Sequence, residues 1–282
     1  MSTPRIDAHQ HFWRYQPTVH QWMDGTMGAI KRDFLPEDLA PRLAALGFDG
    51  CVAVQASQTL EETRWLLELA DAHPVIRGVV GWVDLRSPEV AAQLARYAVH
   101  PRFVGVRHVV HDEADDRFLL GAEFRRGIAA LAGTGLVYDL LLFPRHLPIA
   151  EEFVRGFPDQ PFILDHLAKP LIKGRIREPW ATDLRRLAAH GHVACKLSGL
   201  VTEADWATWR PKDLHPYLDV ALEAFGPQRL LIGSDWPVCH LAGAYAETMA
   251  AVLDWTATLR PAERDAILGG NAVRLYRLGV PS

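Results

Sequence analysis

Arg5-Ile6-Asp7-Ala8-His9-Gln10-His11-Phe12-Trp13 is the stretch around which the chain is organised. Ile6 and Ala8 alternate with Asp7, His9 and His11, and this alternation predicts a short strand. On such a strand His9 and His11 share one face and lie roughly 7 Å apart along the backbone. Two imidazoles at a strand end can bind a metal ion or a polar substrate. The histidine pair indicates a functional site only if polar residues also lie at the ends of the later strands.

Apolar runs of strand length alternate with helix-length amphipathic segments along the whole chain. Predicted strands lie in residues 5–13, 50–55, 76–83, 103–108, 136–142, 162–166, 193–198 and 229–235. Predicted helices lie in residues 36–47, 59–70, 87–98, 124–132, 149–157, 180–189, 214–225, 244–259 and 261–278. Continuous apolar runs are typical of parallel strands covered on both faces. Because no Pro-, Ser- or Gly-rich linker divides the chain, we predict an α/β fold, a single-domain (β/α)8 TIM barrel over residues 1–282.

The composition narrows the class of protein. Of the 282 residues, 49% are hydrophobic and 23% are charged, which supports a packed core, and the net charge of −4 comes without a basic stripe for nucleic acid. The N-terminus lacks the apolar segment of a signal peptide, and no run of about 18 apolar residues predicts a membrane span. The three cysteines form no C-x-x-C motif. We expect a cytoplasmic protein with neither nucleic-acid nor membrane partners; its oligomeric state is left open.

Polar residues gather where the predicted strands end. Buried charges are costly unless they are paired, so these groups must pair with one another or with a ligand. In TIM barrels the chemistry lies at the C-terminal ends of the strands. The residues are His9, His11, Gln55, Arg107, His108, Asp139, Asp165, His166, Lys169, Lys196, Ser198, Ser234 and Asp235.

A long polar and aromatic segment, residues 14–33, follows the first strand and carries Trp22. Connections of this length in compact domains are often functional lids. A surface loop held in place by its aromatic residues explains the segment equally well.

Several motifs occur in a fixed order, and together they resemble the amidohydrolase superfamily, of the amidohydrolase 2 type. They are Asp7-Ala-His-Gln-His-Phe-Trp13, Gly105-Val-Arg-His-Val109, Leu164-Asp-His-Leu-Ala-Lys-Pro170, Lys196-Leu-Ser-Gly199, Ile232-Gly-Ser-Asp-Trp-Pro237 and Ile267-Leu-Gly-Gly-Asn-Ala272. Within the superfamily they are similar to the sugar-lactone hydrolases, a branch that includes L-fuconolactonases and L-rhamnonolactonases. The resemblance implies a barrel hydrolase, a carboxylic-ester hydrolase that opens an aldonolactone such as L-fuconolactone.

The resemblance also assigns residues. The superfamily's histidine pair on the first strand matches His9 and His11, its histidine on the sixth strand matches His166, and its aspartate on the eighth matches Asp235. The residues that bridge two metals in binuclear members have no match here. The resemblance therefore implies at most one divalent cation, with zinc suited to His9, His11, His166 and Asp235. An empty site is the other expectation, because lactonases of this kind include members that need no metal.

From these residues we predict roles in lactone hydrolysis. Asp235 accepts a proton from the attacking water as general base, while His9, His11 and His166 hold the water or the carbonyl oxygen. The predicted substrate-binding residues are Arg107, His108, Asp139 and Lys196 for hydroxyl groups and charge, and Trp22 and Trp236 for the apolar face of the sugar.

Two alternatives remain at this point. One is a metal-dependent decarboxylase of the same superfamily, which would take a carboxylated aromatic substrate. The other is a barrel that binds a sugar acid without catalysis, although such a protein needs no general base. The sequence has no G-x-S-x-G motif, which argues against a serine nucleophile.

Overall fold

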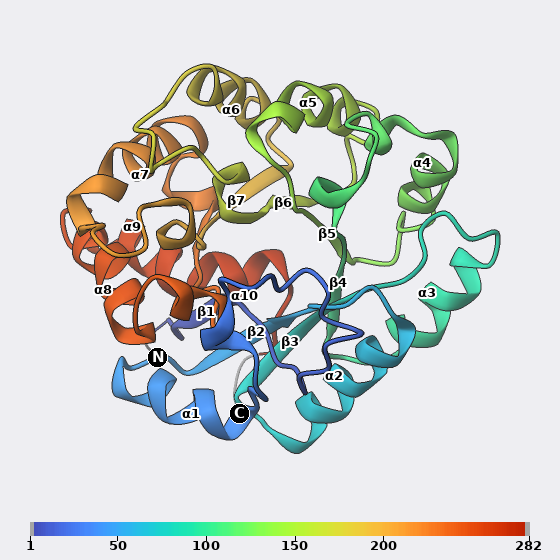
Figure 1. Cartoon of the computed structure of the whole chain (residues 1–282). Helices are drawn as coiled ribbons and strands as arrows, with labels where there is room; N and C mark the ends of the chain where they lie inside the picture. The colour runs from blue at the N-terminus through green and yellow to red at the C-terminus, as the bar shows by residue number, and fades with distance from the viewer. Residues whose placement is uncertain (1–2, 280–282) are drawn as a thin grey trace.

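Eight parallel strands form the barrel in this computed structural model, which describes residues 3–279. They pair in chain order (Figure 1): β1 (Ile6–Gln10), β2 (Gly50–Val54), β3 (Ile76–Gly81), β4 (Phe103–His108), β5 (Val137–Leu140), β6 (Phe162–Leu164), β7 (Val193–Leu197) and β8 (Leu230–Ile232). A parallel bridge between Gln10 and Trp236 joins the end of β1 to the chain after β8. The predicted (β/α)8 barrel is confirmed.

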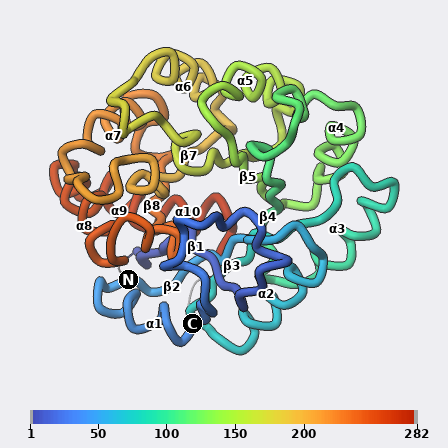
Figure 2. The backbone as a smooth tube through the Cα atoms, in the orientation of Figure 1, coloured from blue at the N-terminus to red at the C-terminus, as the bar shows by residue number. Residues whose placement is uncertain are grey.

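Most helices surround the strands as an outer ring, which the tube in Figure 2 traces from blue to red, whereas the short last helix packs across the base of the barrel. They are α1 (Pro36–Ala45), α2 (Leu60–Ala72), α3 (Val90–Ala98), α4 (Ala122–Ala129), α5 (Leu147–Arg155), α6 (Trp180–Ala188), α7 (Pro211–Phe225), α8 (Tyr245–Thr256), α9 (Pro261–Asp265) and α10 (Asn271–Leu275). The predicted domain of residues 1–282 extends beyond the described residues at both ends and stays a prediction. Within the described residues, no helix is both long enough and apolar enough to span a membrane.

Two apolar clusters hold the barrel together. The larger one lies between the strands and the surrounding helices. The smaller one consists of one or two residues from each strand, such as Ile6, Val52 and Leu231, together with Tyr276 and Leu278 after the last strand. Alternate residues of a strand face opposite sides, so the smaller cluster fills the lower barrel interior. Polar residues replace apolar ones only nearer the C-terminal ends of the strands, which places the site there.

Several strands are shorter than predicted, and β1, for example, ends at Gln10 instead of Trp13. β6 ends at Leu164 and β8 at Ile232, and beyond them His166 and Asp235 adopt left-handed backbone angles, with φ of 53° and 56°. The single helix predicted over 261–278 is divided by a π-helical turn, Ala266–Gly270. At Gly269 a Cβ atom would lie 1.9 Å from the carbonyl oxygen of Pro4, so the chain can pass there only without a side chain.

Candidate active site

Irregular pairing in two strands turns key side chains into the barrel. In β1, Asp7 pairs with Cys51 but Gln10 pairs with Ala53, so β1 carries one extra residue between these positions. This β-bulge lets His9 point inward although Ala8 also faces the interior. Asp7 instead points outward and accepts hydrogen bonds from Ser234. The expected alternation, with Asp7 on the face of His9 and His11, is therefore broken.

The second irregularity lies in β4. Val79 pairs with Phe103 and Val80 pairs with Gly105, so β4 also carries one extra residue. Val104 belongs to the interior cluster, and Arg107 nevertheless reaches inward to Asp165. Bulges of this kind often redirect side chains next to active sites.

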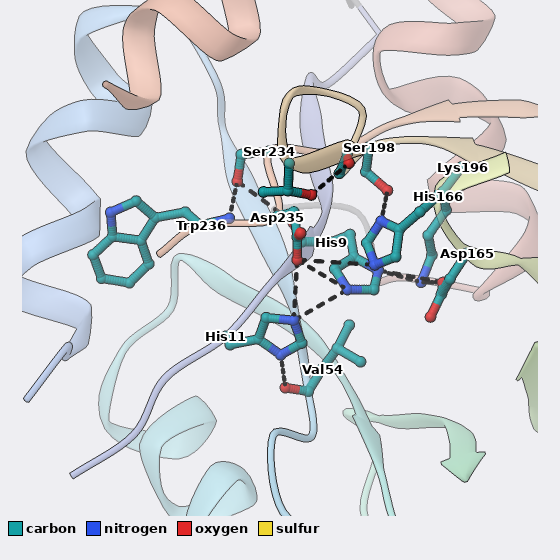
Figure 3. A network of polar contacts seen from close by, with 12 residues as sticks. His9, His11, Val54, Asp165, His166, Lys196, Ser198, Ser234, Asp235 and Trp236 are labelled. Carbon is teal, nitrogen blue, oxygen red and sulfur yellow. Dashed lines mark hydrogen bonds and ion pairs between the residues drawn. The ribbon is translucent and has the colours of Figure 1, made fainter. Parts of the chain in front are cut away.

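Three histidines and one aspartate converge at the C-terminal end of the barrel (Figure 3). His9 Nε2 lies 3.2 Å from His11 Nε2 and 3.7 Å from Asp235 Oδ1. Asp235 Oδ1 lies 3.3 Å from His11 Nε2 and 3.9 Å from His166 Nε2. The structure thus brings together the four residues that the sequence singled out. We call His9, His11, His166 and Asp235 the upper site.

Neighbouring groups fix the orientation of the upper site. His11 Nδ1 donates to the Val54 carbonyl at 2.8 Å, and His166 Nδ1 lies 2.8 Å from Ser198 Oγ. His166 opens a run of four left-handed residues that ends at Lys169. Each non-glycine residue in this conformation costs roughly 1–2 kcal/mol. The run places His166 toward Asp235 and Lys169 in the wall of the cavity above.

A buried ion network lies directly beneath the upper site. Arg107 Nη1 lies 3.0 Å from Asp165 Oδ2, and the Lys196 ammonium lies 2.9 Å from Asp165 Oδ1. Lys196 also contacts Asp139, whose carboxylate accepts hydrogen bonds from the Tyr276 hydroxyl. Two carboxylates and two cations balance in charge, which is what allows them to be buried. We call Arg107, Asp139, Asp165 and Lys196 the lower network.

The surroundings control the charge of the upper site. Burial would raise the pKa of Asp235, but His166, His11 and His9 together lower it below its usual value. Burial lowers the pKa of His166 to about 4, against the opposing effect of Asp235 and Asp165. Burial likewise lowers the pKa of His9 well below its usual value. Near pH 7 the ionised Asp235 carboxylate therefore faces the neutral imidazoles of His9 and His166, an arrangement suited to accept a proton or to bind a cation.

A cavity of about 660 Å³ opens above the upper site. His11, Arg107, His166 and Asp235 form its floor. Segment 14–33 covers one side, held at its base by the antiparallel bridge between Trp13 and Phe34. From this segment the cavity is lined by Thr18, Val19, Trp22 and Met27, and from the other loops by residues that include His111, Asp112, Phe143, Lys169, Glu203 and Trp206.

The predicted substrate-binding residues divide into two groups. Arg107 and Trp22 line the cavity, whereas Asp139 and Lys196 are wholly buried beneath it. His108 turns away and contacts Glu113 at 2.7 Å. Trp236 is also fully buried, because the left-handed turn at Asp235 sends the indole outward.

Outside the barrel, the Trp236 indole packs against Phe12 and Phe34 and donates to His240. His108, Asp139, Lys196 and Trp236 therefore do not line the cavity. The sequence predicted that these four side chains contact the substrate, and the structure instead places them outside the cavity lining.

Sequence reasoning missed several residues of the cavity wall, among them His111, Asp112, Glu203 and Trp206. They lie in loops, where no hydrophobic period marks which side chains point inward. Lys169 and Asp165 are among the polar residues at the predicted strand ends, but the sequence assigned them no role. The one available signal was the motif Leu164–Pro170, which contains both.

The donor set fits a tetrahedral divalent ion. With zinc bonds of about 2.0–2.1 Å, the ligand atoms of a tetrahedral site lie about 3.3 Å apart. The ligand atoms of His9, His11 and Asp235 are separated by 3.2, 3.3 and 3.7 Å, and His166 lies nearby. A second set of potential ligands, His9, Asp165 and His166, shares His9 with the first. Its Asp165 is already bound to Arg107 and Lys196, so the first set is the better site.

Residues 6–278 match the family model described as amidohydrolase. The chain belongs to the amidohydrolase family. Two similar relatives are L-fucono-1,5-lactonases. The one from Burkholderia multivorans is 45% identical over 100% of this chain and 99% of its own length. The one from Burkholderia ambifaria is 41% identical over 99% and 98%.

A solved structure of an amidohydrolase from Burkholderia multivorans with bound zinc resembles this fold closely. It superposes with a TM-score of 0.94 at 45% identity, and the match covers 98% of this chain and 100% of that one. That family member thus binds zinc in its crystal.

Proposed function

We infer that the chain hydrolyses the ester bond of a sugar lactone and releases the open-chain sugar acid. The observation that carries this inference is the upper site, where an ionised Asp235 carboxylate at the cavity floor lies 3.3 Å from His11. The full-length similarity to two L-fucono-1,5-lactonases supports the same class of substrate. We propose L-fucono-1,5-lactone as the first substrate to test.

In the proposed reaction Asp235 is the general base. A water held between Asp235 and the imidazoles loses a proton to Asp235 as its oxygen bonds to the lactone carbonyl carbon. Hydrogen-bond donors at the cavity floor stabilise the negative charge that develops on the carbonyl oxygen. When the ring C–O bond breaks, the proton returns from Asp235 to the departing oxygen, which becomes a hydroxyl group. The base is thereby regenerated.

We propose that the upper site also holds at most one divalent ion, with zinc as the best fit. His9, His11, His166 and Asp235 would be its ligands. When bound, such an ion polarises the ester carbonyl as a Lewis acid. An ester carbonyl is electrophilic enough for the chain's own donors to serve as well, so we propose hydrolysis with or without the ion.

The charges that line the cavity favour a neutral substrate over a carboxylated one. Arg107 is paired with Asp165, and Lys169 lies 3.6 Å from Glu203. Asp112 and Asp235 add two further carboxylates to the lining. A carboxylated aromatic substrate would enter a cavity in which both lining cations are already paired. The balance therefore supports a polyhydroxylated lactone, and it argues against the decarboxylase alternative.

A screen of aldonolactones with a pH indicator tests the proposal, run with and without a chelator. We expect acid release from L-fucono-1,5-lactone under both conditions. Absence of acid release from every aldonolactone, with CO₂ release from a carboxylated aromatic compound, would show the decarboxylase instead. Lactone binding without turnover would show the non-catalytic barrel.

We propose that the protein is cytoplasmic. Cys51, Cys195 and Cys239 are free and buried, as is common in proteins of reducing compartments. The proposed partner is a small sugar lactone, with neither nucleic acid nor membrane, and the oligomeric state is left open.

A further inference from the structure

His9 joins the upper site to the lower network, with one ring nitrogen in each. Its Nδ1 lies 3.2 Å from the Lys196 ammonium and 3.3 Å from Asp165 Oδ1, and those two groups are 2.9 Å apart. An ammonium can only donate a hydrogen bond, and an ionised carboxylate can only accept one. Lys196 and Asp165 therefore favour opposite tautomers of the same imidazole.

One tautomer completes a chain of hydrogen bonds that runs in a single direction (Figure 3). Lys196 donates to His9 Nδ1, His9 Nε2 donates to His11 Nε2 at 3.2 Å, and His11 Nδ1 donates to the Val54 carbonyl at 2.8 Å. The Val54 carbonyl can only accept, so a neutral His11 carries its hydrogen on Nδ1 and accepts at Nε2. In this form every donor has an acceptor without any metal ion.

The other tautomer is the one that a metal ion requires. With the hydrogen on Nδ1 donated to Asp165, the Nε2 atoms of His9 and His11 both present lone pairs toward Asp235. Imidazole binds a metal through an unprotonated nitrogen. Two lone pairs only 3.2 Å apart repel each other unless a cation lies between them. The Arg107 N–H, 3.4 Å from His9 Nε2, gives this form only a long hydrogen bond.

We propose that Lys196 and Asp165 set the metal affinity of the upper site through the His9 tautomer. Lys196 holds the metal-free form, and Asp165 holds the metal-binding form. Both are positioning residues, fully buried below the cavity, and they act only through His9. The site keeps its imidazoles ordered in either state, which lets one set of residues serve with or without an ion. This inference concerns metal occupancy and does not depend on which lactone is the substrate.

The tautomer can be observed directly in metal-free protein labelled with ¹⁵N-histidine. Long-range ¹⁵N–¹H spectra of imidazoles distinguish Nε2–H from Nδ1–H rings. We expect His9 to carry hydrogen on Nε2 in the wild type and on Nδ1 in Lys196→Met. A wild-type His9 with hydrogen on Nδ1 would overturn the proposal, as would an unchanged tautomer in Lys196→Met.

Zinc affinity supplies the second readout, measured by competition with a zinc-binding dye. Lys196→Met should bind zinc about tenfold more tightly or better, and Asp165→Asn should bind it about 10–100-fold more weakly, the usual effect of losing such a partner. A purely structural role for both residues would weaken binding in both variants. Equal or weaker zinc binding by Lys196→Met would therefore refute the proposal.

A double variant keeps the test valid if Lys196→Met alone does not fold. Removing the ammonium leaves the Asp139 and Asp165 carboxylates facing each other without it. Lys196→Met combined with Asp139→Asn removes one charge of each sign and preserves the balance. We expect this variant to show the same tautomer and the same gain in zinc affinity. Because neither readout uses a lactone, failure of the lactone screen would leave these results interpretable.

Discussion

At the scale of single residues, Lys169 and Glu203 form the ion pair that a substrate meets in the cavity wall. Their charged groups lie 3.6 Å apart, and their side chains are 22% and 20% exposed. Burial raises the pKa of Glu203, and Lys169 opposes this rise. A partly exposed pair contributes little to stability, typically about 0–1 kcal/mol. Its position in the cavity therefore points to recognition of hydroxyl groups, which can accept from Lys169 and donate to Glu203.

Lys169→Met should lower kcat/KM for a hydroxylated aldonolactone by about tenfold or more, the effect of losing one charged hydrogen bond. It should change kcat/KM much less for δ-valerolactone, which has no hydroxyl substituents. Lys173→Met is the matched control, since Lys173 is 71% exposed and pairs with Asp205. Equal losses on both lactones would contradict a role in recognition.

The sequence predicted that the four residues of the upper site converge, and the structure confirms this convergence, because they lie at or just beyond the ends of their strands. Their roles in catalysis stay predictions. Asp139 and Lys196 were harder to place. Each precedes the end of its strand and follows an interior apolar residue by two positions, Val137 and Ala194. Residues two positions apart face the same side of a strand. Both side chains therefore point into the barrel, but one layer below the cavity floor. The bulges that turn His9 and Arg107 inward leave no hydrophobic pattern, so only the structure shows them.

At the scale of elements, helix α2 holds the loop that follows β2 against the cavity. Thr59 caps the helix by accepting from Glu62 N, as expected for a capping residue. The Glu62 carboxylate accepts from Ala56 N and Ser57 N in the loop, with its shortest contact at 2.8 Å. The loop lines the cavity through residues 56–59. Glu62 thus positions one wall of the cavity without entering it.

Glu62 should make stability depend on pH. Burial raises its pKa from about 4.5 to about 8, although the Ser57 and Ala56 amides and Arg107 oppose the rise. Since the folded pKa lies above the unfolded one, the stabilisation is complete below pH 4.5 and is lost as pH rises through 8. Between pH 5 and pH 9 the wild type should lose stability relative to Glu62→Gln in urea unfolding.

The neighbouring variant Glu61→Gln serves as control, because Glu61 lies exposed on the same helix. Its unfolding free energy should follow the wild type at every pH. Parallel wild-type and Glu62→Gln curves across this range would contradict the raised pKa.

At the scale of the whole molecule, the last helix ties the base of the barrel to the site. Tyr276, directly after α10, belongs to the interior cluster, and its hydroxyl donates to Asp139 at 2.8–2.9 Å. Asp139 holds Lys196, and Lys196 contacts Asp165 and His9. The chain after the eighth strand therefore supports the first strand's histidine through a continuous polar path.

Tyr276→Phe should lower the free energy of unfolding by about 1.5–3 kcal/mol, the usual worth of a hydrogen bond to a charged group. Tyr138→Phe is the matched control, because the buried Tyr138 hydroxyl has no hydrogen-bond partner among the described residues. That variant should be neutral or slightly stabilising. Equal destabilisation of both variants in urea unfolding would argue against the polar path.

The most direct test of the account is the rate of L-fucono-1,5-lactone hydrolysis by Asp235→Asn. The substitution preserves size and removes the base, so kcat/KM should fall by about 10²–10⁴-fold, the usual contribution of general-base catalysis. The thermal midpoint, measured on the same preparation, should show that the variant is folded at the assay temperature. Near-wild-type kcat/KM in folded Asp235→Asn would contradict the account and remove Asp235 from the mechanism.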